Sequence, residues 1–140
     1  MIKNIKDILC TQEIYDIYSS CMFEPTFDKF KIKAEQMQKD SSASAYGYFS
    51  NEKIIGIIST QETDKTVEII GIAVDTKERH LGIGTKLIDY VKDKCSKPII
   101  AETDSDAVMF YKKYGFNIKE IIVSKSNASF SRHICTLNYK

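Results

Sequence analysis

The sequence lacks long apolar runs, and its composition departs little from that of ordinary globular proteins. Hydrophobic residues make up 43% of the 140 residues and charged residues 28%, which argues against a disordered or fibrous chain. No stretch approaches the roughly 18 consecutive apolar residues of a membrane helix, and the charged amino terminus lacks the apolar core of a signal peptide. We therefore expect one domain over residues 1–140, in the cytoplasm and without a membrane partner.

The sequence also lacks an excess of charge of either sign. Twenty Lys and Arg residues stand against nineteen Asp and Glu residues, which gives a formal net charge of +1. A dedicated nucleic-acid binder usually carries a net basic field. We therefore expect no nucleic-acid partner.

The four cysteines form no recognisable motif. Cys10, Cys21, Cys95 and Cys135 include no C-x-x-C pair, and no histidines cluster with them. A zinc site and a redox motif therefore lack support, and we expect no metal. Covalent catalysis through Cys95 or Cys135 is disfavoured, because neither has a neighbouring base in the sequence.

Hydrophobic spacing predicts helices and strands in alternation, which indicates an α/β fold with helices flanking a mixed sheet. Val67–Val74 is apolar almost throughout, as in a central strand covered on both faces, and only Glu68 interrupts it. The other predicted strands are 1–6, 45–50, 54–60, 99–102, 117–124 and 131–138, and the predicted helices are 11–21, 26–39, one after residue 82 and one from 104 to 115.

A turn with two glycines joins the central strand to the next helix, in the order Arg79, His80, Leu81, Gly82, Ile83, Gly84. The first N–H groups of a helix lack internal partners, and the peptide dipoles add positive potential there, so this turn suits a phosphate. Glycine at both positions removes side chains that would block a ligand. An ordinary strand-to-helix turn has the same pattern, and the spacing fits neither a Rossmann fingerprint nor a Walker loop.

Arg79, Gly82 and Gly84 fill every fixed position of the pattern R/Q-x-x-G-x-G/A. The segment thereby resembles the acetyl-CoA motif of the GNAT superfamily of N-acetyltransferases. The order of predicted elements agrees with this family over nearly the whole chain. The resemblance implies the GNAT fold, a mixed and mostly antiparallel sheet of about six or seven strands flanked by about four helices.

A second GNAT motif, N-x-x-A-x-x-x-Y-x-x-x-G-F, is matched at Ala107, Tyr111, Gly115 and Phe116, with Asp104 in place of the usual Asn. The resemblance implies acetyl-CoA as co-substrate. The residues that it assigns to the coenzyme are Ile72, Ala73 and Val74 along the pantetheine arm, Arg79, His80, Leu81, Gly82, Ile83, Gly84 and Thr85 around the pyrophosphate, and Asp104 and Tyr111.

Amide formation from a thioester needs a neutral amine, a donor to the oxyanion and a proton for the thiolate. The resemblance assigns the general base to Glu68 and the general acid to Tyr111. Glu102 is a second candidate base, because strand ends face the ligand crevice of open α/β sheets. Each residue also has a purely structural interpretation. Glu68 could lie at an exposed strand start, and Tyr111 could be a core aromatic residue.

The predicted function is transfer of an acetyl group from acetyl-CoA to a primary amine, by direct attack in a ternary complex. The alternative is a non-catalytic module that binds or senses acetyl-CoA. The amine-bearing acceptor, a small molecule or a protein, would contact residues 22–26 and 125–131, where no motif identifies it. The sequence leaves open a monomer or a homodimer.

Overall fold

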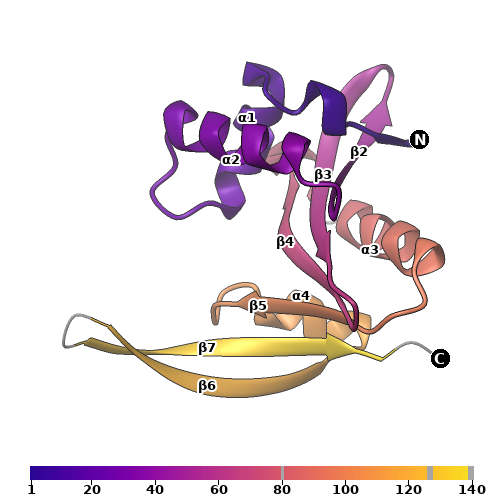
Figure 1. Ribbon diagram of the computed structural model, residues 1–140. Helices are drawn as coiled ribbons and strands as arrows, with labels where there is room; N and C mark the ends of the chain where they lie inside the picture. Colours follow the sequence, from indigo (N-terminus) through magenta and orange to yellow (C-terminus); the bar gives the residue numbers. More distant parts are fainter. Residues whose placement is uncertain (80, 126–127, 139–140) are drawn as a thin grey trace.

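The computed structural model describes residues 1–79, 81–125 and 128–138, and a seven-stranded sheet runs through them (Figure 1). The helices and strands follow one another in the predicted order. They are β1 (Ile2–Asn4), α1 (Gln12–Tyr18), α2 (Phe27–Lys39), β2 (Ala43–Ser50), β3 (Lys53–Glu62), β4 (Val67–Val74), α3 (Ile83–Lys94), β5 (Ile99–Thr103), α4 (Val108–Tyr114), β6 (Asn117–Lys125) and β7 (Ala128–Leu137), with short 3-10 helices η1 (Lys6–Ile8), η2 (Ser19–Cys21) and η3 (Thr76–Glu78).

The strands lie in the order β1-β2-β3-β4-β5-β7-β6. Each neighbouring pair is antiparallel except β4 and β5, which run parallel. A parallel neighbour needs a crossover connection, and α3 supplies it. The predicted mixed, mostly antiparallel sheet flanked by helices is confirmed.

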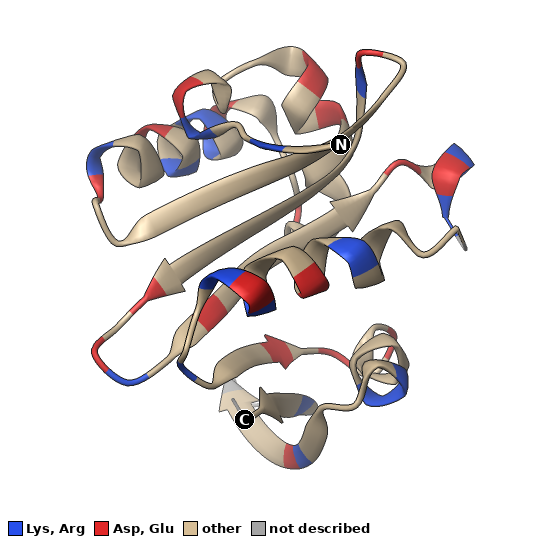
Figure 2. Cartoon of the chain, turned by 90° about the vertical axis from the view of Figure 1, so that its right-hand side faces the viewer, with Lys and Arg blue, Asp and Glu red and all other residues tan. Residues whose placement is uncertain are grey.

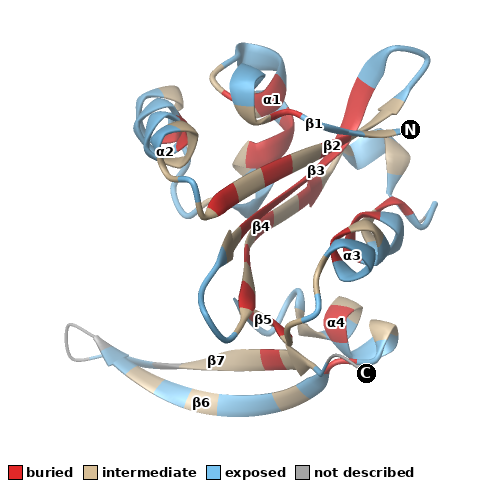
Figure 3. Cartoon of the chain, turned by 45° about the vertical axis from the view of Figure 1, so that its right-hand side comes forward, coloured by how far each residue is buried: buried red, intermediate tan, exposed pale blue. Residues whose placement is uncertain are grey.

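Helices α1 and α2 pack on one face of β2, β3 and β4 (Figure 3). Both begin after a threonine N-cap, since Thr11 Oγ1 accepts from Ile14 N at 3.3 Å and Thr26 Oγ1 accepts from Lys29 N at 3.1 Å. Apolar side chains on the inner stripe of each helix meet the sheet; they include Ile14, Ile17, Tyr18, Phe30 and Ala34. These helices therefore cover one face of β4.

Helix α3 covers the opposite face of the same strands, and α4 packs beside it on β6 and β7 (Figure 1). Leu87 and Ile88 of α3 are fully buried, as the helical stripe in the sequence predicts. Helix α4 begins later than predicted, at Val108 rather than near residue 104. It ends as predicted at Gly115, whose φ of 120° favours glycine and whose N–H donates to the Tyr111 carbonyl at 3.2 Å.

The strands β4 and β5 pair over only two residues at their amino ends, Val67 with Ile99 and Glu68 with Ile100. Beyond that point they diverge, and Figure 1 shows β4 rising away from β5. Part of the divergence comes from β4 itself, where Ile70 is skipped in the pairing with β3 and forms a bulge. From residue 69 to residue 74, β4 has a neighbour strand on one side only within the described chain.

The central strands carry few charges, whereas α2 and α3 alternate acidic and basic residues along their outer surfaces (Figure 2). This distribution is typical of strands covered by a helix on each face. Of the helices that the structure describes, none is long and apolar enough to cross a bilayer.

Candidate active site

The gap between β4 and β5 holds a cavity of about 860 Å³, a size typical of a small-molecule or cofactor site. Several separate segments contribute to its wall. They are residues 69–74 of β4, 82–85 at the start of α3, 102–104 at the end of β5, 20–23 around η2, four residues at and before α4, two beside η3 and Arg132 of β7. The cavity therefore collects most of the motif residues named from the sequence.

The start of α3 presents free main-chain donors to this cavity. Gly82 caps the helix with φ 77°, a conformation that favours glycine, and no side chain bonds to the cap. Among the described residues, the first N–H near the helix start that meets a main-chain acceptor is that of Lys86, 3.0 Å from the Gly82 carbonyl. The preceding N–H groups of Ile83, Gly84 and Thr85 belong to the orphan donors of a helix start, so they can bind an anion.

Gly84 also allows α4 to approach α3. A Cβ at this position would lie 3.0 Å from two ring atoms of Phe110 on α4. This is tighter than ordinary side-chain contact, so any larger residue would push the two helices apart or displace the Phe110 ring. The glycine motif thus sets the shape of the cavity as well as its donors.

Around this turn, Arg79 lines the cavity, and its Nε donates to the Val74 carbonyl at 3.3 Å. The predicted cofactor residue Leu81 is 61% exposed and does not line the cavity. His80, predicted to contact phosphate, lies outside the described residues. Arg79 is therefore the basic side chain that the described part of this turn brings to the cavity, next to the acidic Glu78.

The predicted pantetheine segment, Ile72 to Val74, lies on the unpaired edge of β4. Main-chain N–H and C=O groups on such an edge can pair with an extended ligand, as in strand addition. The position of β4 is also set by α1, because Tyr18 packs so closely on Gly71 that a Cβ there would lie 2.7 Å from the Tyr18 Cζ atom. The Tyr18 hydroxyl in turn shares a hydrogen bond of 2.8 Å with Ser59 Oγ, which holds α1 against the sheet.

Tyr111 lines the cavity from α4 and is only 4% exposed. Its ring packs edge-on against Phe110 and Phe116, with centroids 5.3 and 5.2 Å apart. Burial raises the pKa of Tyr111 above the usual range of tyrosine, so the phenol stays protonated at neutral pH. The side chain is thus both a core aromatic residue and a possible proton donor in the cavity.

Asp104 stabilises the turn that leads into α4. Its Oδ1 accepts from the N–H groups of Asp106 and Ala107, both at 3.0 Å. An asparagine at this position has the same side-chain oxygen, so the substitution of Asp for the usual Asn preserves both turn hydrogen bonds. Asp104 also lines the cavity.

The two candidate bases lie at different depths of the gap. Glu68 is half-buried at the closed end, beside Ile100, and is not among the residues that line the cavity. Glu102 lines the cavity, and its side chain is 48% exposed. The structure thus brings Glu102, rather than Glu68, to the same cavity as Tyr111.

Arg132 and Cys21 are cavity residues that the sequence did not identify. Arg132 Nε lies 3.1 Å from Glu102 Oε2, an ion pair between side chains 30 residues apart in the chain. The Cys21 thiol donates to the Tyr18 carbonyl at 3.1 Å, and burial raises the pKa of Cys21 to about 11. This thiol is therefore neutral at physiological pH and a weak nucleophile.

His133 does not contribute to this cavity. It neighbours Arg132 on β7 and is not among the residues that line the cavity. Its Nε2 lies 3.8 Å from Glu120 Oε2. Within the described chain, no group of three or more His, Cys, Asp or Glu residues is placed to hold a metal ion.

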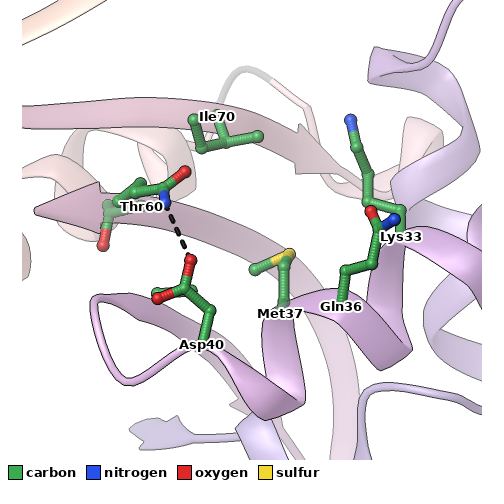
Figure 4. A pocket seen from close by; sticks show the side chains of 8 residues that line it. Lys33, Gln36, Met37, Asp40, Thr60 and Ile70 are labelled. Carbon is green, nitrogen blue, oxygen red and sulfur yellow. Dashed lines mark hydrogen bonds between the residues drawn. The ribbon is translucent and has the colours of Figure 1, made fainter.

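A second, smaller cavity of about 190 Å³ lies between α2 and the sheet (Figure 4). Its acidic group is already engaged, because Asp40 Oδ2 accepts from Gln61 Nε2 at 2.8 Å and Asp40 Oδ1 from Ser42 Oγ at 2.7 Å. The bonds from Ser42 also lower the pKa of Asp40. We therefore assign this cavity a structural role and take the larger one as the active site.

The comparisons with known proteins agree with this geometry. A model of the acetyltransferase (GNAT) family matches residues 11–116. A search of curated proteins gives no match.

Several solved structures share the fold. The ribosomal-protein-S18-alanine N-acetyltransferase from Escherichia coli superposes with a TM-score of 0.77 at 18% identity, over 100% of this chain and 94% of that chain. An aminoglycoside 6'-N-acetyltransferase complexed with coenzyme A gives 0.76 at 17% identity, over 97% and 94%. A GNAT family acetyltransferase from Elizabethkingia anophelis with acetyl-CoA bound gives 0.71 at 23% identity, over 99% and 97%. Since the family model spans well over half of the sequence, the chain belongs to the acetyltransferase (GNAT) family.

Proposed function

We propose that the protein is an N-acetyltransferase that moves the acetyl group of acetyl-CoA to a primary amine, by direct attack in a ternary complex. One observation carries the proposal: the unpaired edge of β4, the free donors at the start of α3 and the protonated Tyr111 all meet in one cavity. These groups suit the pantetheine amides, the pyrophosphate and the leaving sulfur in turn. Residues 1–140 act in this proposal as one catalytic domain.

The chemistry uses one named side chain as proton acceptor and one as proton donor. The acceptor arrives as an ammonium ion and loses one proton to Glu102, directly or through water. The neutral nitrogen attacks the thioester carbonyl, and the oxyanion forms beside the main-chain donors of β4. The nitrogen loses its second proton to solvent as the C–S bond breaks, the thiolate takes a proton from Tyr111, and solvent then returns a proton to Tyr111 and removes the one held by Glu102. The products are the N-acetyl amide, free CoA thiol and one proton released to solvent.

Glu102 is preferred as base because it lines the cavity, whereas Glu68 lies at the closed end of the gap. Family members named above act on amines, one on a ribosomal protein and one on aminoglycosides, which supports nitrogen as the acceptor atom. A cytoplasmic location suits the four free cysteines, which a reducing compartment preserves.

Thermal unfolding tests the coenzyme assignment without knowledge of the acceptor. Acetyl-CoA at about a hundred times its dissociation constant should stabilise the protein by roughly 2.7 kcal/mol and raise Tm by several degrees. ATP and NAD serve as controls, and an equal shift with either would contradict the assignment. Release of CoA thiol with an amine panel then tests turnover, and tight binding without release would favour a binding or sensing module.

A further inference from the structure

Glu102 and Arg132 lie on the face of β5 and β7 that is turned away from α4. Glu102 is directly opposite Ile134, and Arg132 is two residues further along the same face. Ala101 and Cys135, the adjacent cross-strand pair, point to the other face, where they are buried with Tyr111. The cavity is therefore lined from both sides of the sheet, with Tyr111 on one side and the Glu102–Arg132 pair on the other.

The side that holds this pair also faces α2. Glu68 pairs with Ile100, so Glu68, Ile100 and Glu102 share one face, and Ile70 on that face contacts the small cavity under α2. The start of α3 and Tyr111 lie on the other side of the cavity, where the proposed coenzyme binds. The face that holds Glu102 and Arg132 is therefore left for the acceptor. Cys21, Met22 and Phe23, which follow α1, complete its wall.

The guanidinium of Arg132 is only partly used. It donates through Nε to Glu102, and no hydrogen bond links its two terminal nitrogens to other described residues. Its side chain is 28% exposed, so these donors remain accessible from the cavity. An exposed ion pair of this kind adds little to stability, which leaves the position of Arg132 in the cavity wall without a structural reason.

A guanidinium with free terminal nitrogens suits an oxyanion, because its planar fork matches carboxylate or phosphate oxygens in a bidentate contact. The neighbouring carboxylate of Glu102 suits an ammonium ion or its proton. The two groups are 3.1 Å apart, so a ligand that contacts both must carry its amine and its anion close together.

We propose that the acceptor is a primary amine that carries an oxyanionic group, a carboxylate or a phosphate, a few atoms from its nitrogen. Arg132 binds the oxyanion, and this contact turns the guanidinium away from Glu102, whose carboxylate then faces the amine. The inference rests on the proposed N-acetyltransferase function and specifies its substrate class.

The test compares matched acceptors with saturating acetyl-CoA, followed by release of CoA thiol. Each amino acid is paired with its own primary amide, for example β-alanine with β-alaninamide, and an aminoalkyl phosphonate replaces the carboxylate in a third arm. We expect kcat/KM to favour the anionic member by about 10- to 100-fold, the range of a hydrogen bond to a charged group. The phosphonate arm tells which oxyanion fits better. Equal rates for acid and amide would overturn the proposal.

Arg132→Gln removes the charge but keeps a hydrogen-bonding side chain, and it should bring the ratio of acid to amide close to one. Lys119→Gln is the matched control, because Lys119 sits opposite Ile134 on the same face, one strand further out, and does not line the cavity. It removes the same charge and should leave the ratio unchanged. An equal fall in both variants would indicate general electrostatics and contradict the proposal.

Binding separates failure of the inference from failure of the proposed function. Calorimetric titration of β-alanine into the protein saturated with CoA needs no turnover. If no amine is acetylated but β-alanine binds wild type and not Arg132→Gln, the oxyanion site stands and the catalytic proposal falls. If amines are acetylated but β-alanine binds both proteins alike, the catalytic proposal stands and the oxyanion site is wrong.

Discussion

On the α3 side of the cleft the groups offered to a ligand belong mainly to the main chain, whereas on the α2 side they belong to side chains. The start of α3 and the edge of β4 present N–H and C=O groups whose positions depend on glycine and on strand geometry. The other side presents Glu102, Arg132, Cys21 and Phe23. The first surface keeps its chemistry when most of its side chains change, so it suits a ligand common to a family. The second changes with each substitution, so it suits a ligand particular to one enzyme.

The largest effect is expected from substitution of Tyr111, the side chain that takes part in the chemistry from the coenzyme side of the cavity. Tyr111→Phe should lower kcat by about 10²- to 10⁴-fold through loss of the general acid, with acetyl-CoA affinity largely kept. Because burial raises the pKa of Tyr111, the wild-type enzyme should keep this acid protonated beyond pH of about 10, the usual pKa of tyrosine. Thiol release across a pH series measures both. Unchanged kcat at every pH would remove Tyr111 from the mechanism.

The next effect distinguishes the two candidate bases. Glu102→Gln should lower kcat by about 10- to 100-fold. The loss is smaller than for a base that nothing can replace, because water can carry the proton. Glu68→Gln should lower it much less, since Glu68 does not line the cavity. The kcat of each variant at saturating acceptor decides between them. A larger loss in Glu68→Gln would restore the assignment made from the sequence.

Two glycines allow a matched test of the main-chain side. Gly82 and Gly115 both have positive φ, 77° and 120°, and a Cβ at either position would meet no atom within 4 Å. Alanine at either should cost about 1–2 kcal/mol of backbone strain, seen as a lower Tm. Only Gly82→Ala should also weaken acetyl-CoA binding, by roughly tenfold, because it alters the donors at the start of α3. Equal affinity in the two variants would contradict a phosphate site at this turn.

The smallest effect concerns Asp104, a side chain whose role is to hold main chain in place. Asp104→Asn keeps the accepting oxygen and should change the free energy of unfolding by less than about 0.5 kcal/mol, whereas Asp104→Ala should cost about 1 kcal/mol through loss of the two turn hydrogen bonds. Urea denaturation measures both. A large loss in Asp104→Asn would show that the charge, rather than the oxygen, matters.

The sequence was informative where function depends on local backbone. Gly82, Gly84 and Gly115 lie at fixed spacing beside predicted helix ends, and the structure places each at such an end. Val67–Val74 was predicted with its observed limits because a strand buried on both faces is apolar throughout. These features depend on a few consecutive residues, so spacing alone reveals them.

The acceptor side could not be predicted in this way. Glu102 and Arg132 meet only because β5 and β7 pair in one register, which brings together residues 30 positions apart. Glu68 was assigned as base from the resemblance to the family, but its distance from the cavity depends on where β4 and β5 separate. That point follows from the bulge at Ile70 and from packing on both faces of the sheet, which no short pattern encodes.

The short pairing of β4 with β5 also affects the mechanics of the molecule. Two residue pairs are all that join β1 to β4 with β5 to β7 by main-chain ladder bonds in the described chain, so the sheet is a pair of half-sheets with a seam between them. An extended coenzyme lying along β4 would take the place of the missing strand pairing and would link the two half-sheets through its own contacts. Occupancy by acetyl-CoA would then govern how rigidly the two halves hold together, and the supply of the co-substrate would govern the lifetime of the folded enzyme as well as its rate.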